Sequence, residues 1–243
     1  MDRPKVIWYV MIKTNVLKKI IILALILALP GFLYYLLTAK GKNRYEPLSY
    51  FGPKQLAKTS HIVKGRSIPD TIYHTIPDFN LQDQNGKAVS LESLTGKILI
   101  VNFFYTTCPN ICSQVNQNIA KLAAQYAHNK ITKFISITVN PRHDSAAVLK
   151  QYGVKFDADS TRRLFLTGDT AVIYPLARQG FLVNALDEGN GNFVYSDKVV
   201  LIDESHHIRG YYSGTSDDDM NRLDNEIKVQ IAEEIRKNDH SLY

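Results

Sequence analysis

The sequence predicts an α/β layer fold with a partly parallel central sheet, preceded by one N-terminal transmembrane helix. An uncharged run of eighteen residues covers 20–37. Two continuous apolar runs of strand length follow at 97–105 and 133–139. Stretches with apolar residues at helical spacing separate the predicted strands, and this alternation is typical of a layered α/β protein.

The composition is that of a globular protein. Of the 243 residues, 45% are hydrophobic and 21% are charged, which favours a packed core over a disordered chain. The net charge is +6, but the basic residues are spread thinly and form no stretch interleaved with aromatic side chains. We therefore expect no nucleic acid among the partners.

The uncharged run predicts a single-pass membrane anchor. We assign residues 1–18 to a short N-terminal tail and residues 19–38 to the anchor. At about 1.5 Å per residue, the run is just long enough to span the hydrocarbon core of a bilayer. A cleaved signal peptide is the alternative, but the run is longer than a typical signal-peptide core and no clear small-x-small cleavage site follows it.

The flanking charges say little about orientation, because five basic residues precede the run and four follow it. A closely spaced thiol pair is better suited to a compartment outside the cytosol. We therefore place the large domain on the extracytoplasmic (periplasmic) side. Residues 39–69 mix Lys, Gly, Pro and Ser without sustained periodicity, so we expect a tether there and a folded domain over 70–243.

The folded domain is expected to open with a hairpin whose turn is 83–87 (DQNGK). The run at 97–105 is apolar on both faces, which places it in the middle of a covered sheet. Apolar residues at helical spacing then predict a helix that starts near residue 111. The later elements are expected as strands at 133–139, 163–167, 197–203 and 208–212, and as helices at 144–152 (with Asp144 as N-cap), 171–178 and 217–237.

The chain has two cysteines, Cys108 and Cys112, which directly follow the first buried strand and open a helix. Residues four apart share a helix face, so the two sulfurs can converge. A helix N-terminus favours thiolate, which is both a nucleophile and a soft ligand that selects Cu(I). The pair therefore predicts a redox site or a Cu(I) site. The alternative is a purely structural role, in which both cysteines are inert thiols buried in the core. A four-ligand zinc site would need a second cysteine pair.

The segment 103–112 (FFYTTCPNIC) resembles the active-site motif of the Sco/SenC family of copper chaperones. The resemblance covers about residues 70–235 and is also carried by 77–96, 137–144, 165–168 and 199–214. It implies a thioredoxin-like fold with a central mixed sheet. It also implies a copper site made by the two cysteines and one distant histidine, and a role in assembling the copper centre of a respiratory cytochrome oxidase.

One position departs from the family pattern. The family's third ligand is a histidine just before the strand expected at 197–203, and Tyr195 holds that place. A phenol is a hard donor and suits Cu(I) poorly. His143 is a candidate replacement because it follows the second buried strand, at the sheet end that carries active sites in open α/β folds. His206 and His207 lie a strand length away, roughly 26 Å.

Four functions stay open at this point. A metallochaperone would deliver Cu(I) to an oxidase subunit without turnover, and the family resemblance favours it. A metal-free thiol–disulfide oxidoreductase would act on cysteines of an extracytoplasmic partner, and Tyr195 favours it. A peroxidase is less favoured because no arginine lies close to the cysteines in sequence, and a scaffold with inert thiols is the fourth. The remaining histidines are expected to face solvent: His61, His74, His128 and His240.

Overall fold

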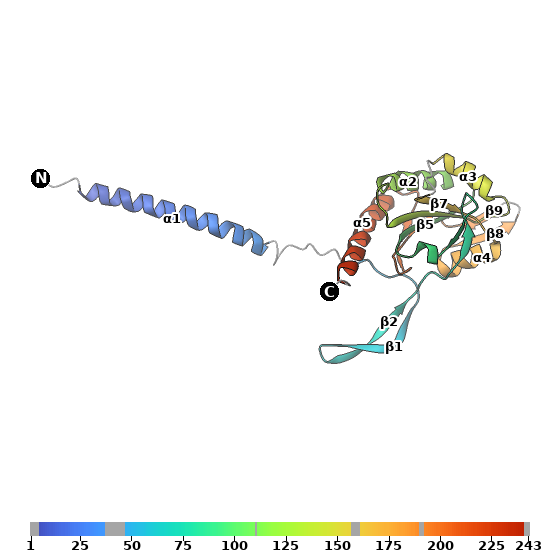
Figure 1. The fold of residues 1–243 in the computed structure, drawn as a ribbon, viewed down its shortest axis with the longest axis horizontal. Helices are drawn as coiled ribbons and strands as arrows, with labels where there is room; N and C mark the ends of the chain where they lie inside the picture. Colours follow the sequence, from blue (N-terminus) through green and yellow to red (C-terminus); the bar gives the residue numbers. More distant parts are fainter. Residues whose placement is uncertain (1–4, 37–46, 110, 157–160, 190–191, 241–243) are drawn as a thin grey trace. The chain divides into compact units, whose positions relative to one another are not determined.

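The computed structural model of the chain describes residues 5–36, 47–109, 111–156, 161–189 and 192–240, and divides the chain into two compact units, residues 1–46 and 47–243. The described part of the first unit forms the helix α1 (Lys5–Tyr35; Figure 1). Its segment Lys18–Tyr35 has a mean hydropathy of 1.7 and is long and apolar enough to cross a membrane. Helix length and composition thus agree with the anchor expected at 19–38, of which 37–38 lie outside the described residues.

A five-stranded mixed sheet forms the centre of the second unit, with the strand order β11-β10-β5-β6-β7. Its strands are β5 (Ile98–Phe104), β6 (Thr132–Thr138), β7 (Arg163–Leu166), β10 (Lys198–Ile202) and β11 (Ile208–Ser213). The strands β5, β6 and β7 are parallel, whereas β10 runs antiparallel to both β5 and β11. The predicted α/β class with a central mixed sheet is therefore confirmed.

Helices cover both faces of this sheet. They are α2 (Ile111–Gln125), α3 (Ala146–Val154), α4 (Thr170–Pro175), which continues into the π-helical turn η3 (Leu176–Gly180), and α5 (Asp217–His240). Alternate residues of β5 point to opposite faces. Ile98 and Ile100 pack in the cluster that includes α2 and α5, whereas Leu99 and Val101 pack in the cluster that includes α4 and η3. Because both faces are covered, all of β5 is buried and its sequence is apolar except for Asn102.

The expected entry hairpin is present as β3 (Asn80–Gln82) and β4 (Ala88–Ser90). Its turn depends on Asp83, whose Oδ1 accepts hydrogen bonds from the backbone N–H groups of Asn85 at 2.8 Å and Lys87 at 2.9 Å. Gly86 has a φ of 78°, a left-handed conformation that glycine adopts without steric cost. A short 3-10 turn, η2 (Glu92–Leu94), leads into β5.

Two hairpins were not expected. One is formed by β1 (Lys54–Val63) and β2 (Arg66–Tyr73), inside and just after the stretch predicted to be a tether. Nearly all of its side chains are exposed on both faces, so its sequence carries no alternation between buried and exposed positions. The other is formed by two short strands, β8 (Ala185–Gly189) and β9 (Asn192–Tyr195), and the acidic residues Asp187 and Glu188 interrupt the apolar pattern in β8.

Candidate functional site

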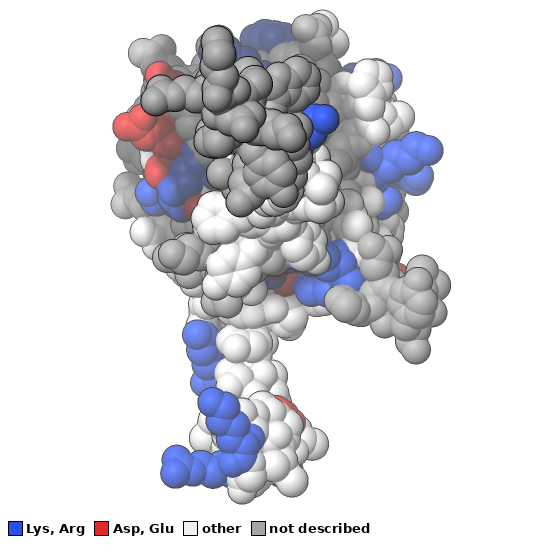
Figure 2. Space-filling view, turned by 90° about the vertical axis from the view of Figure 1, so that its left-hand side faces the viewer, with Lys and Arg blue, Asp and Glu red and all other residues white. Residues whose placement is uncertain are grey.

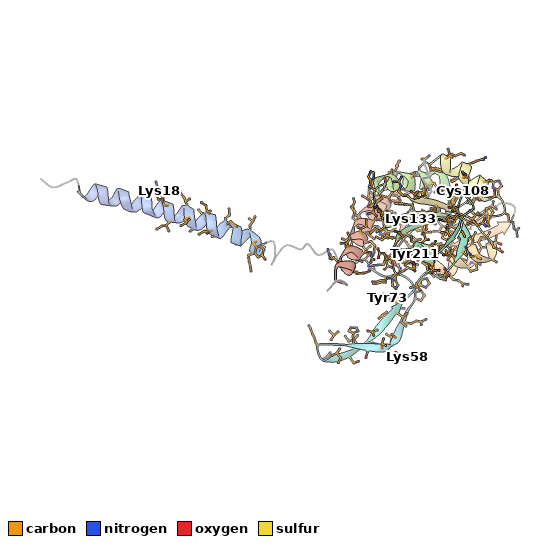
Figure 3. The ribbon with its side chains drawn as sticks, viewed as in Figure 1. Lys18, Lys58, Tyr73, Cys108, Lys133 and Tyr211 are labelled. Atoms are coloured by element: carbon orange, nitrogen blue, oxygen red, sulfur yellow. A yellow bond between two sulfur atoms is a disulfide. The ribbon has the colours of Figure 1, made fainter. Side chains whose placement is uncertain are left out.

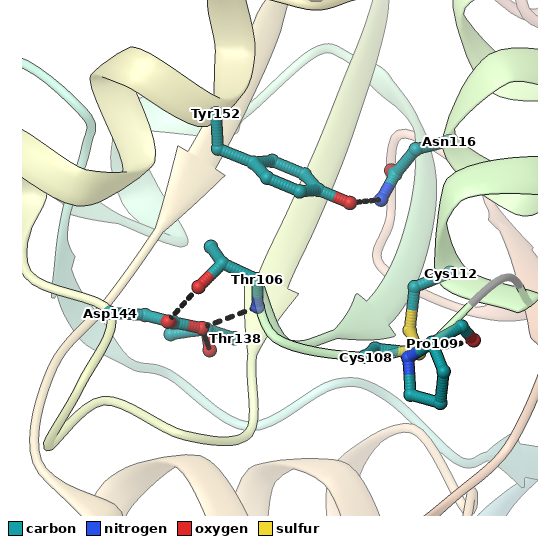
Figure 4. Close-up of a disulfide and its surroundings, with 8 residues drawn as sticks. All are labelled: Thr106, Cys108, Pro109, Cys112, Asn116, Thr138, Asp144 and Tyr152. Carbon is teal, nitrogen blue, oxygen red and sulfur yellow. Dashed lines mark hydrogen bonds between the residues drawn. A yellow bond between two sulfur atoms is a disulfide. The ribbon is translucent and has the colours of Figure 1, made fainter.

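The two cysteines form a disulfide at the start of α2 (Figure 4), with their Cα atoms 5.9 Å apart. Cys108 lies in the loop that follows β5 and is partly exposed. Cys112 lies in the first turn of α2, is 1% exposed, and belongs to the hydrophobic core. The loop therefore presents one sulfur toward solvent and holds the other inside the domain.

The loop is held by hydrogen bonds to a buried carboxylate, that of Asp144. Its Oδ2 accepts a hydrogen bond from the backbone N–H of Thr106 at 3.0 Å and one from the hydroxyl of Thr138 at 2.5 Å. Its Oδ1 accepts a short hydrogen bond from the hydroxyl of Thr106. Asp144 was predicted to cap the following helix, and that prediction is wrong. Ser145 is the N-cap of α3, because the carboxylate of Asp144 turns inward to the cysteine loop.

His143 lies at the sheet end where it was predicted. The register pairs Phe104 with Thr138, so the loops after β5 and β6 leave the sheet at the same edge. The Nδ1 of His143 is 2.7 Å from Asp144 Oδ1 and 3.3 Å from Thr106 Oγ1. A carboxylate on Nδ1 leaves Nε2 to act as the acceptor or ligand, which is the usual arrangement of a metal-binding histidine.

His143 nevertheless does not complete a metal site with the cysteines. Within the part of the chain that the structure describes, no three His, Cys, Asp or Glu side chains are grouped so that they could hold a metal ion. The side chain of His143 is 52% exposed, and its hydrogen-bond contacts near the cysteine loop are with Thr106 and Asp144. The donor set that the structure brings together is therefore the two sulfurs, with one histidine near their loop.

The backbone of Tyr195 lies at the same edge of the sheet. Tyr195 ends β9, where it pairs with Ala185, and β10 begins at Lys198. Val199 lies opposite Asn102 near the end of β5, so the chain before β10 approaches the start of the cysteine loop. The ring of Phe193 is 4.8 Å from the ring of Tyr105 in that loop. The Tyr195 side chain lies outside the described residues.

His206 and His207 lie at the opposite end of the sheet, as predicted. They follow β10, whose last residue, Ile202, pairs with Leu99 near the start of β5. They do not form a solvated turn, however. The ring of His207 packs edge-on against Tyr50 at 5.2 Å, and burial lowers the pKa of His206.

The other histidines only partly match the expectation that they face solvent. His61 is exposed and pairs with Asp70 at 2.6 Å, and His128 is exposed. His74 is half-buried, and its Nε2 lies 2.7 Å from the carbonyl oxygen of Gly180, so for this residue the expectation was wrong. The side chain of His240 lies outside the described residues.

A polar network beside Cys112 was missed by the sequence analysis (Figure 4). Asn116, one helical turn after Cys112, donates to the hydroxyl of Tyr152 at 3.1 Å and accepts from Arg163 at 2.8 Å. Burial raises the pKa of Tyr152 and lowers the pKa of Arg163 to about 10. The available signal was an asparagine at the i+4 position from Cys112, on the apolar face of the helix.

Residues 70–230 match the sequence profile of the SCO1/SenC family. The chain belongs to this family. In Bacillus subtilis (strain 168), the SCO1 protein homolog is 26% identical over 167 residues, covering 68% of this chain and 86% of that relative. The structure of Bradyrhizobium japonicum ScoI with copper bound is 25% identical with a TM-score of 0.55, covering 64% of this chain and 99% of ScoI. The predicted family and thioredoxin-like fold are therefore confirmed.

A third relative bears the name of a redox enzyme. The thiol-disulfide oxidoreductase ResA of Bacillus subtilis (strain 168) is 33% identical over 113 residues. The match covers 44% of this chain and 59% of ResA. The SCO1/SenC chain thus resembles both a protein solved with copper bound and one named for thiol chemistry.

Proposed function

We propose that this SCO1/SenC protein carries Cu(I) between the thiolates of Cys108 and Cys112 and delivers it to the copper-bearing subunit of a cytochrome oxidase. The observation that carries the proposal is the convergence of the two sulfurs, one at the surface and one in the core. Soft thiolates select Cu(I) among the available metals. The accessible Cys108 is then the sulfur that an acceptor's ligands reach first.

Loading requires the reduced pair. A dithiol donor gives two electrons and two protons to the Cys108–Cys112 disulfide and becomes a disulfide itself. Cu(I) then replaces the two thiol protons, which are released to solvent. Copper is the transported ion in this scheme, and the two thiolates are the ligands that bind it. A third ligand would set the affinity. His143 is the candidate for that ligand, and its hydrogen bond to Asp144 would orient it.

The membrane segment supports an anchored, extracytoplasmic placement of this site. The apolar helix α1 precedes the folded unit, and the two cysteines are placed to form a disulfide. Disulfides persist outside the reducing cytosol. We infer that residues 19–38 hold the protein in the membrane and that residues 70–243 face the periplasmic side.

Titration of the reduced full chain with Cu(I), against a competing chelator, tests the proposal. We expect one Cu(I) per chain, with binding abolished in Cys108→Ser/Cys112→Ser. A weaker affinity in His143→Ala would assign the third ligand, with the exposed His128→Ala as the matched control. Tyr195→His is the complementary variant, and it should tighten binding if this position occupies the family's ligand place. Failure of the reduced wild-type chain to compete for Cu(I) would refute the copper role.

Metal-free thiol–disulfide exchange is the second candidate, because the pair is oxidised and no third ligand is grouped with it among the described residues. A partner thiolate would attack the accessible Cys108 sulfur, releasing Cys112 as thiolate and forming a mixed disulfide. The partner's second thiolate would then attack its own bridged sulfur and release Cys108. In the reverse direction, the Cys108 thiolate attacks a partner disulfide and Cys112 then releases the partner, so Cys112→Ser should trap a mixed disulfide with an oxidised partner. That trapping, together with no competitive Cu(I) binding by the wild type, is the distinguishing result.

A further inference from the structure

The β1–β2 hairpin is an exposed arm that lies mainly before the family-matched residues 70–230. Figure 2 shows it projecting from the rest of the domain, with basic and uncharged side chains on its surface. Its alkyl side chains are exposed, most strongly Leu56 at 75% and Ile62 at 79%, and less so Val63 at 40%, Ile68 at 42% and Ile72 at 55%. An apolar cluster of this kind on an arm without its own core points to an interaction surface.

The apolar residues near the tip lie on both faces of the hairpin. Ile62 pairs with Ser67 and Val63 with Arg66, and successive residues of a strand point to opposite faces. Ile68 lies on the same face as Arg66 and therefore as Val63. A folded protein partner that covered one face would leave the other in water. A lipid phase surrounds both faces of an inserted tip, so it accounts for the pattern better.

The charges of the hairpin are strongly unbalanced. Four basic residues, Lys54, Lys58, Lys64 and Arg66, stand against one acidic residue, Asp70. The carboxylate of Asp70 is engaged by His61 at 2.6 Å. Such a basic segment is attracted to anionic lipid headgroups, and each cation adds to the attraction while salt weakens it.

The chain also keeps the hairpin near a membrane. Residues 37–53 connect the helix that is apolar enough to span a bilayer to the first hairpin strand. Seventeen residues extend about 60 Å when fully stretched, so the hairpin cannot leave the neighbourhood of the surface. The surface within reach is therefore that of the membrane in which α1 is anchored.

We propose that the tip of the β1–β2 hairpin docks into the interfacial region of an anionic bilayer. Ile62, Val63 and Ile68 would enter the boundary between headgroups and acyl chains. The ammonium and guanidinium groups of Lys64 and Arg66 reach back to lipid phosphates on their long apolar stems. These two cations keep the insertion shallow.

The base of the hairpin transmits this docking to the domain. The ring of Tyr73 stacks on Tyr50 at 4.1 Å, and the backbone N–H of Ile76 donates to the carbonyl oxygen of His206 at 2.9 Å. The His206 turn lies beyond the start of β5, whereas Cys108 follows its end, about 23 Å away over the seven residues of β5. Figure 3 likewise places Cys108 and the hairpin's Lys58 on opposite sides of the domain. A docked tip therefore turns the cysteine loop away from the lipid, toward a partner above the membrane.

Quenching of tryptophan fluorescence by lipids brominated on their acyl chains tests the docking. The chain has one tryptophan, Trp8, so the full-length Trp8→Phe/Ile62→Trp variant reports only from the tip. It is reconstituted with its anchor into vesicles of phosphatidylcholine, either with or without phosphatidylglycerol. We expect strong quenching in the anionic vesicles and little in the neutral ones. High salt should abolish most of the quenching in anionic vesicles. Adding the three substitutions Lys58→Glu, Lys64→Glu and Arg66→Glu to the reporter variant should have the same effect.

The matched control is Trp8→Phe/Val154→Trp, which places the reporter at a position 74% exposed on α3. It should stay unquenched in both kinds of vesicle. An intact Cys108–Cys112 disulfide and unchanged circular dichroism show that each variant is folded. Three results overturn the proposal: no quenching at position 62, equal quenching in neutral and anionic vesicles, or equal quenching at positions 62 and 154. The docking rests on the proposed membrane anchor, but none of these readouts involves copper, so the test is independent of the copper role.

Discussion

The backbone N–H of Thr106 donates to Oδ2 of Asp144 at 3.0 Å, and the Thr106 hydroxyl donates to the other oxygen of the same carboxylate. The loop that carries Cys108 is thereby tied, two residues before the cysteine, to the loop that follows β6. Asp144 is fully buried and also accepts from Thr138, so one side chain joins the ends of two adjacent strands. These hydrogen bonds to Asp144 preorganise the loop that carries Cys108 for ligand binding.

Replacing Asp144 by asparagine should therefore loosen the cysteine loop. An amide N–H₂ would take the place of one carboxylate oxygen and face a hydrogen-bond donor, leaving buried donors without partners. We expect a loss of about 3 kcal/mol in the free energy of unfolding, measured by chemical denaturation. Asp169→Asn is the matched control, because Asp169 caps α4 at the surface through Ala171 N–H at 2.8 Å. Equal losses in the two variants would contradict a special role for Asp144.

The two cysteines should differ in reactivity after reduction. Cys108 is partly exposed, whereas Cys112 is 1% exposed in the core. We expect iodoacetamide to alkylate Cys108 in the Cys112→Ser variant on the order of tenfold faster than Cys112 in the Cys108→Ser variant, because thiol reactions depend on access. Mass spectrometry over time measures both rates. Similar rates would mean that the start of α2 opens in the reduced protein.

The sequence was sufficient for the central sheet and the cysteine loop, and the reason is physical. Strands buried on both faces, such as β5, are almost entirely apolar, and this pattern does not occur in exposed polar loops. The cysteine spacing and the helix that follows are local features, so both were found. His143 was placed at the correct sheet edge because the parallel order of β5 and β6 decides where their loops emerge.

What the sequence did not show depends on contacts between distant segments. Asp144 was taken for a helix cap because its position before α3 suits one, and only the packed structure reveals that its carboxylate turns toward Thr106. The β1–β2 hairpin has no buried face, so no periodicity marks it. The Asn116–Arg163 contact joins positions 47 residues apart, which no local pattern can indicate.

Acidification should destabilise the fold partly through His206. Burial lowers its pKa, and within the described residues its buried Nε2 has no hydrogen-bond partner. Above the unfolded pKa of about 6.5, a histidine with a lowered folded pKa is neutral in both states, and the stability of the fold is at its full value. As the pH falls below about 6.5, the unfolded chain binds the proton first, so the free energy of unfolding decreases. His206 also has a φ of 65°, which asparagine tolerates. The free energy of unfolding of His206→Asn, measured relative to wild type by urea denaturation, should therefore increase as the pH is lowered from about 7.5 to about 5.5. His128→Asn, at an exposed position, should show no such trend.

Two arginines are buried in the described part of the domain, and their removal should differ strongly in its effect on stability. Arg209 is 1% exposed and satisfied. Its guanidinium binds Asp203 at 3.2 Å and Glu233 at 2.9 Å, and lies 4.3 Å from the ring centre of Tyr50. Arg163 is 2% exposed, but its Nε and Nη1 have no hydrogen-bond partner among the described residues. Its polar contact is Asn116, and it otherwise stacks 4.8 Å from the ring centre of Phe165.

Arg209→Met should therefore cost about 3–5 kcal/mol of unfolding free energy, because it strands the buried carboxylate of Asp203. Arg163→Met should cost less than about 1 kcal/mol or even stabilise, because it removes a desolvated charge that no carboxylate compensates. Urea denaturation of the full chain in detergent measures both. Burial lowers the pKa of Arg163 to about 10, and this predicts how the stability difference changes with pH. Wild type gains stability as the pH rises through this folded pKa toward the unfolded arginine pKa of about 12.5, because the folded protein releases the proton first over that range. The stability of Arg163→Met relative to wild type should therefore fall over the same range. A large loss in Arg163→Met at neutral pH would instead show that its bond to Asn116 supports the turn of α2 that follows Cys112.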